Sequence, residues 1–185
     1  MMIPGRQWWQ RLRHSRGFGV HSPFAYRFIR EVLRGPYAFY AYADLPGASS
    51  GWPGGCDAAR VLFRIAVWAW PASVAVCGEG REAAAARRIV GLACPHAEID
   101  VDAGEGCGLA VVCPDAAQEQ LEGVFRAASA GTAAVYIADR HAPQCAALLH
   151  RLGVLDYGHT YVNGSGVAIF VGRRALPAQT FRVRF

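Results

Sequence analysis

The chain has 185 residues, of which 53% are hydrophobic and only 18% are charged. This length fits one domain, and the low charge excludes a disordered chain. The longest apolar run, residues 65–76, is broken by Pro71 and is short of the roughly 20 residues that cross a bilayer, and the N-terminus lacks an apolar signal core, so we expect a cytoplasmic protein.

The basic residues are concentrated near the N-terminus. Residues 1–34 hold seven Arg and one acid, Glu31, whereas the rest of the chain holds twelve Arg and thirteen acids. Residues 4–16 predict a short helix that carries two Trp among its Arg residues. A basic aromatic helix can lie on a membrane surface or on nucleic acid. The interpretation that we favour is packing on its own domain or on a second copy of the chain, as in a homodimer.

The next segment, residues 17–33, reads GFGVHSPFAYRFIREVL. Ser22 predicts an N-cap and Pro23 suits the first helical position. Apolar residues then recur at helical spacing until a Gly-Pro pair ends the run. We expect Ser22 to cap this helix and both Phe24 and Phe28 to be buried.

Residues 45–55, LPGASSGWPGG, are typical of a loop or linker. The loop separates an N-terminal helical extension, residues 1–45, from the domain proper, residues 56–185. Asp57 predicts the cap of a helix over residues 58–70, which Pro71 ends.

A strand, a glycine turn and a helix follow. Residues 73–77 (SVAVC) predict a buried strand, Gly78-Glu79-Gly80 a turn, and the Ala-rich residues 81–93 a helix. Further strands are expected at residues 98–101, 109–113 and 133–138, and further helices near residues 116–130 and 143–152. This alternation predicts a parallel α/β sheet, and residues 157–162 and 167–171 predict an antiparallel hairpin at its edge.

Six cysteines are spread over the chain without CxxC or Cys/His ligand spacing. We expect most of them to be buried thiols and predict no metal site. They are Cys56, Cys77, Cys94, Cys107, Cys113 and Cys145.

The word GVHSPF before an aromatic amphipathic helix, and the terminal TFRVRF, resemble the two ends of a bacterial family of class I S-adenosylmethionine (SAM) methyltransferase-like proteins. Residues 61–65, 74–78 and 136–141 fall in the family's order. The resemblance implies a Rossmann-like, three-layer α/β sandwich with N-terminal helices and a C-terminal antiparallel hairpin. The fold is shortened, since only residues 103–108 stand where relatives carry a helix, a strand and a helix that help to enclose the adenine.

The resemblance also implies SAM as the cofactor. Gly78, Glu79 and Gly80 would lie against its methionine moiety, and Asp102 would accept hydrogen bonds from the two ribose hydroxyls. Only Gly78 clearly matches the family's glycine motif, and a lone GxG is a weak signal. A turn that no longer contacts a cofactor is therefore the alternative at this loop.

Asp139 and His141 follow the strand at residues 133–138, where a carboxylate could orient an imidazole for acid–base chemistry. The alternative, which we favour, is a hydrated end of a strand. Asp115 and Asp139 together are too few ligands for a divalent cation.

Two functions follow from these observations. The first is a SAM-dependent methyltransferase with an unknown methyl acceptor, such as a small molecule. The second is a catalytically inactive scaffold of the same fold, whose basic aromatic N-terminus contacts a protein, a membrane surface or nucleic acid.

Overall fold

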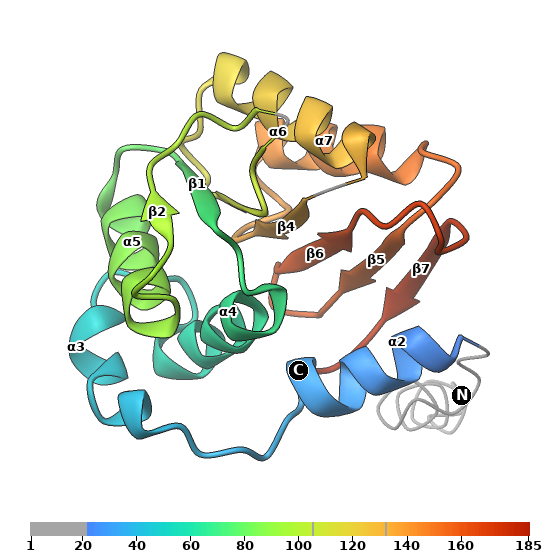
Figure 1. Cartoon of the computed structure of the whole chain (residues 1–185). Coiled ribbons are helices and arrows are strands. Elements are labelled where there is room, and N and C mark those ends of the chain that lie inside the picture. Colours follow the sequence, from blue (N-terminus) through green and yellow to red (C-terminus); the bar gives the residue numbers. More distant parts are fainter. Residues whose placement is uncertain (1–21, 105, 132) are drawn as a thin grey trace, which may run out of the picture.

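A seven-stranded sheet lies at the centre of the part of the chain that the structure, a computed structural model, describes: residues 22–104, 106–131 and 133–185 (Figure 1). Its strand order is β2-β1-β3-β4-β6-β5-β7, and only β6 runs antiparallel to its neighbours. The strands are β1 (Ser73–Cys77), β2 (Glu98–Ile99), β3 (Leu109–Val112), β4 (Ala134–Ile137), β5 (His159–Val162), β6 (Ala168–Val171) and β7 (Gln179–Arg182). The chain is thus an α/β protein with a mixed sheet, compatible with a Rossmann-like fold.

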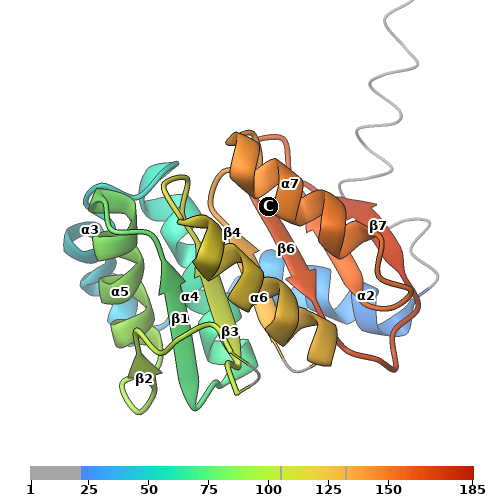
Figure 2. The same cartoon turned by 90° about the horizontal axis from the view of Figure 1, so that it is seen from above.

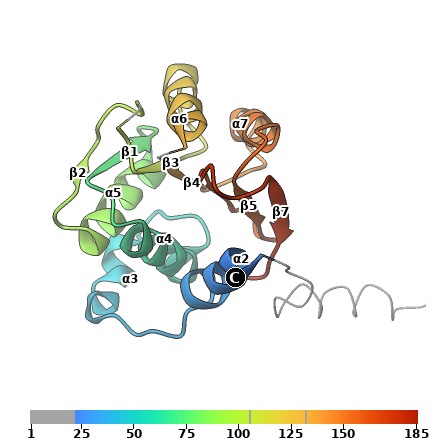
Figure 3. The same ribbon diagram turned by 45° about the vertical axis from the view of Figure 1, so that its right-hand side comes forward.

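Helices cover both faces of the sheet. Figures 2 and 3 show α6 and α7 on one face and α2, α4 and α5 on the other. Crossovers between parallel strands are right-handed, so α5 and α6 lie on opposite faces because they lead the chain in opposite directions from the centre of the sheet. The helices are α2 (Pro23–Arg27), the π-helix η1 (Phe28–Leu33), the 3₁₀-helix η2 (Tyr40–Ala43), α3 (Leu45–Ala48), α4 (Gly55–Ala69), α5 (Arg81–Ala93), α6 (Gln118–Ala130) and α7 (Pro143–Gly153).

The central strand and its helix lie where the sequence predicts them. β1 pairs in parallel with both β2 and β3, and α5 follows directly after the glycine turn. Alternate residues of β1 enter the two cores: Val74 and Val76 pack beneath α4 and α5, whereas Ala75 and Cys77 pack beneath α6 and α7. Both faces of β1 are therefore dry, as its uniformly apolar sequence requires.

The cap of α2 is confirmed, because Ser22 Oγ accepts a hydrogen bond from the Ala25 N–H at 3.2 Å. Phe28 is only 2% exposed, as expected. The expectation for Phe24 is wrong: its ring is half-buried at the periphery, with the Arg173 guanidinium 5.4 Å from its centre. The predicted helix at residues 4–16 lies outside the described residues.

Two boundaries near the loop at residues 45–55 differ from expectation. The segment contains the short helix α3, and α4 begins at Gly55, before Asp57. Gly54 and Gly55 both have positive φ, so they turn the chain into the helix without a capping carboxylate. Asp57 instead lies in the first turn of α4 and pairs with Arg60 at 3.0 Å.

The C-terminal hairpin forms, but it is not at the edge of the sheet. β6 lies between β4 and β5, and β7 pairs with the outer side of β5. All four residues of β6 are buried, whereas β7 is mostly exposed and ends in Arg182, which suits an edge strand. β2 is also shorter than predicted and ends at Ile99.

No helix among the described residues combines the length and apolar character that crossing a membrane requires.

Candidate functional site

The strand order reverses between β1 and β3. From β1 the chain moves through α5 to β2, and from β3 it moves through α6 to β4 on the other side. Open α/β sheets bind ligands beyond the carboxyl ends of the strands at such a point. Two loops meet here: residues 78–80 after β1 and residues 113–117 after β3.

Gly78 is required by the geometry of the first loop. Its φ is +121°, a conformation that side-chain-bearing residues rarely adopt. A Cβ at this position would lie 2.4 Å from Asp115 Oδ1 and 2.9 Å from the Cβ of Cys113. The glycine therefore allows the second loop to approach the first closely.

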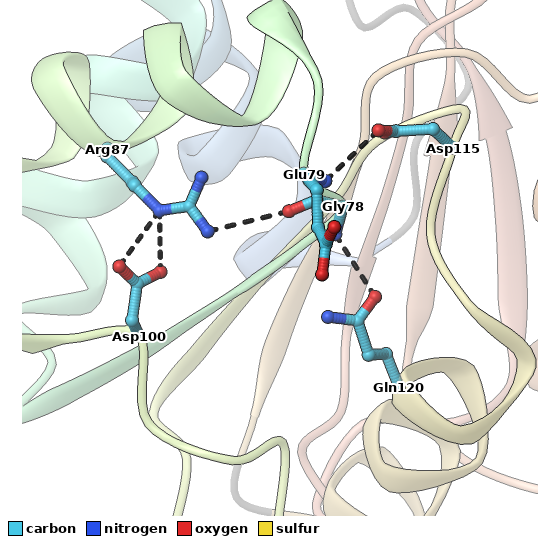
Figure 4. A network of polar contacts seen from close by, with 6 residues as sticks. All are labelled: Gly78, Glu79, Arg87, Asp100, Asp115 and Gln120. Atoms are coloured by element: carbon cyan, nitrogen blue, oxygen red, sulfur yellow. Dashed lines mark hydrogen bonds and ion pairs between the residues drawn. The ribbon is translucent and has the colours of Figure 1, made fainter.

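The backbone N–H groups of the first loop are held by side chains from the second loop and α6 (Figure 4). Gly78 N–H donates to Gln120 Oε1 at 3.1 Å. Glu79 N–H and Gly80 N–H both donate to Asp115 Oδ2, at 3.0 and 2.7 Å. Gly80 is the N-cap of α5, so this carboxylate also lies at the positive end of the helix dipole.

A cavity of about 540 Å³ lies beside these loops. Its volume falls in the range of small-ligand sites, roughly 300–1,000 Å³. Its walls are the end of β1, residues 100–104 after β2, the start of α6 and Arg87 of α5. Gln120 is shared between the cavity wall and the hydrogen bonds of the first loop.

Two aspartates after β2 line this cavity, and they differ in whether their carboxylates are paired with another residue. Asp100, with φ +69°, is paired with Arg87, whose Nε lies 2.8 Å from both carboxylate oxygens (Figure 4). Arg87 Nη2 also donates to the Gly78 carbonyl at 3.4 Å. Asp102 is exposed, and its carboxylate makes no hydrogen bond or ion pair with any other described residue. Of these two aspartates, Asp102 is thus the one that can accept hydrogen bonds from a ligand; Glu119 of α6 is a further exposed acid on the cavity wall.

Asp139 and His141 lie in a different place. They follow β4, and neither is among the described residues that line the cavity. Asp139 Oδ1 accepts a hydrogen bond at 2.9 Å from the backbone N–H of His141, so the carboxylate closes its own turn. The turn lies against the β5–β6 connection, where Arg140 N–H donates to the Gly166 carbonyl at 2.7 Å. The structure therefore brings these two residues together, but apart from the other candidates.

The buried thiols offer no nucleophile. Five of the six cysteines are buried and Cys56 is half-buried, as expected for most of them. Burial raises the pKa of the thiols of Cys77 and Cys113 to about 12 and that of Cys145 to about 11. A thiol must be deprotonated to attack, so these residues stay inert near neutral pH. No group of three or more His, Cys, Asp or Glu suited to a metal ion occurs among the described residues.

Sequence reasoning did not identify Arg87 or Gln120, and it considered Asp115 only as a metal ligand. Asp115 follows β3 as Asp102 follows β2, and carboxyl ends of parallel strands meet at one edge of a sheet. That rule places Asp115 near the glycine turn. It does not reveal that the side chain would reach the turn's N–H groups.

In comparisons with known proteins, no family model matches the chain, and no curated protein or solved structure matches it either.

Proposed function

We propose that the chain is a SAM-dependent methyltransferase-like protein whose cavity between β1, the segment after β2 and α6 receives the adenosine portion of SAM. The observation that carries this proposal is the carboxylate of Asp102, which no other described side chain or backbone group pairs with, on the wall of a cavity of about 540 Å³. A carboxylate is a good acceptor for the two hydroxyls of a ribose, because its two oxygens can accept both bonds at once.

The arrangement of the loops also supports the proposal. The cavity lies at the reversal of strand order, next to a glycine turn that leads into α5. In this interpretation the fold is a shortened class I methyltransferase sandwich. The connection between β2 and β3 is only nine residues long, 100–108, so the adenine would be partly exposed to solvent and the affinity for SAM weak.

For methyl transfer, SAM supplies an electrophilic methyl group, and the protein's contribution is mainly to hold the acceptor near it. His141 is exposed at the carboxyl end of β4, one strand beyond β3, where it could receive a proton from an acceptor. Asp139 positions this segment through its hydrogen bond to the His141 backbone.

A second candidate is a catalytically inactive scaffold of the same fold. Two observations favour it. Asp115 already accepts hydrogen bonds from N–H groups of the glycine turn, and the Asp139 carboxylate accepts a hydrogen bond from the backbone instead of orienting the His141 imidazole. Its partner would be a protein, a membrane surface or nucleic acid at the basic aromatic N-terminus.

Calorimetric titration of the full chain with SAM and S-adenosylhomocysteine separates the two candidates. We expect saturable, weak binding that Asp102→Ala reduces by at least about tenfold, equivalent to about 1.4 kcal/mol. Asp139→Ala is the matched control: it removes a carboxylate from the neighbouring part of the sheet and should spare binding while abolishing any methyl transfer. Absence of heat at millimolar ligand, or unchanged affinity in Asp102→Ala, would favour the scaffold.

A further inference from the structure

The glycine turn after β1 already holds a carboxylate, and that carboxylate belongs to the protein. Two consecutive N–H groups, those of Glu79 and Gly80, converge on one oxygen of Asp115 at the start of the 13-residue helix α5. Proteins use this arrangement of N–H groups and helix dipole to hold the carboxylate or phosphate of a ligand. Here the position is filled from within the chain.

Little room remains for a second anion. Asp115 Oδ1 lies within 2.4 Å of the position that a Cβ on Gly78 would take, and the third N–H, that of Gly78, is held by Gln120. An incoming carboxylate would need the same donors and would meet a like charge. The turn itself is therefore not a vacant site.

The adjoining cavity is a different environment. It reaches the turn through Gln120, and it is also lined by Asp102, whose carboxylate has no partner among the described residues and suits a hydroxyl-bearing ligand. Asp115 does not itself line the cavity, but a ligand that fills the cavity and extends past Gln120 to the turn would bring its end group to the N–H groups that Asp115 holds. A neutral, short end group needs none of these N–H groups, whereas the carboxylate of an amino-acid tail would compete for them with the like-charged carboxylate of Asp115.

We propose that Asp115 determines the specificity of the cavity: it favours adenine nucleosides with a short, uncharged 5′ group and must leave the glycine turn before a ligand with an amino-acid carboxylate can bind fully. This inference rests on the proposed function, since it takes the cavity to be an adenosine site. It identifies Asp115 as an internal competitor for the methionine end of SAM.

Two nucleosides make a matched pair of probes. S-adenosylhomocysteine and 5′-deoxy-5′-methylthioadenosine are both thioethers of adenosine, and they differ in the amino-acid tail that only the first carries. In calorimetric titrations the wild-type chain should bind methylthioadenosine at least as tightly as S-adenosylhomocysteine. Asp115→Ala should raise the affinity for S-adenosylhomocysteine by about tenfold and change that for methylthioadenosine by less than about twofold, because only the tail meets Asp115.

Two further variants keep the test decisive. Asp115→Asn retains an oxygen for the two N–H groups and removes the charge, so it should fold and should raise the affinity for S-adenosylhomocysteine by a smaller factor. Asp156→Ala removes an exposed carboxylate from the connection between α7 and β5 and should change neither affinity.

The outcomes distinguish a failure of the proposed role of Asp115 from a failure of the proposed adenosine site. If methylthioadenosine binds but neither Asp115 variant improves the binding of S-adenosylhomocysteine, the role of Asp115 is overturned and the adenosine site stands. If neither nucleoside binds to any folded variant, both are overturned. An equal gain for both nucleosides would also overturn the inference, because the tail would not be what Asp115 opposes.

Discussion

Polar side chains at the carboxyl ends of β1 and β3 join different segments of the chain, whereas the side-chain oxygens of Asp139 and Asn163 close their own turns. At β1 and β3, Asp115 reaches Gly80 across 35 residues of sequence, and Arg87 reaches Asp100 across 13. At β4, β6 and β5, Asp139 contacts the residue two positions on, and Asn163 Oδ1 accepts from N–H groups two and four positions on. Contacts between loops build the walls of a cavity, whereas contacts within a turn stabilise only that turn.

The interiors of the two halves differ as well. Beneath β5 and its neighbours the packing is aromatic: the Phe28 ring lies 4.7 Å from that of Tyr161 and 4.8 Å from that of Trp68. β1 and β3 are built largely of Val and Ala. We therefore expect substitutions in the aromatic half to act on stability and those at the β1–β3 loops to act on ligand binding.

The largest expected effect is in the aromatic half. Phe28→Ala should lower the free energy of unfolding by about 3–5 kcal/mol, because it leaves a cavity where a buried ring packs. Urea denaturation followed by circular dichroism measures this change. Tyr40→Ala, which removes a fully exposed ring, should stay within about 0.5 kcal/mol. A loss below about 1 kcal/mol for Phe28→Ala would show that the aromatic packing contributes little.

The next largest effect is expected at the glycine turn after β1, compared with the turn between β5 and β6. Gly78→Ala should destabilise the fold by at least about 1–3 kcal/mol, since it puts a side chain at a strained φ and against Asp115. Gly164→Ala, in the β5–β6 turn, is the matched control, because its Cβ would meet no atom within 4 Å. Equal unfolding free energies for the two variants would contradict the close approach of the two loops.

A smaller difference is expected between the two aspartates. Asp115→Ala should cost about 1 kcal/mol, because it removes a carboxylate from two N–H groups at the start of α5. Asp139 holds one N–H of an exposed turn, so Asp139→Ala should cost less than about 0.5 kcal/mol. Thermal unfolding of both variants measures the difference. A larger loss of stability in Asp139→Ala than in Asp115→Ala would contradict the distinction between contacts that join two loops and contacts within one turn.

The smallest effect concerns pH in the aromatic half. Burial lowers the pKa of His159 below its ordinary value of 6.5, and its ring packs against Phe24 and Phe181. Below that value the unfolded chain binds a proton that the folded chain resists, so stability should fall as the pH falls through this range. His159→Phe keeps an aromatic ring and should weaken this dependence in urea titrations between about pH 7.5 and pH 5.5. An unchanged slope would show that His159 is not its source.

Local patterns predicted those parts of the fold whose signals are local. The bounds of β1 and α5 and the cap of α2 follow from apolar runs, Ala-rich sequence and a Ser-Pro pair. Asp102 was singled out by the family resemblance, which implies an acid after the second strand, and it does line the cavity. Phe24 was misjudged because helical spacing gives the direction of a side chain but not how far the next layer extends over it.

The sequence by itself determined that this chain is an α/β protein with buried thiols and a glycine turn after its first strand. Only the tertiary structure decided that β6 lies inside the sheet, that Arg87 pairs with Asp100 rather than with Asp102, and that Asp115 accepts hydrogen bonds from the N–H groups of the turn. The physical reason is that periodicity and propensity act between near neighbours, whereas strand order and contacts between loops depend on segments that meet only when the sheet has formed.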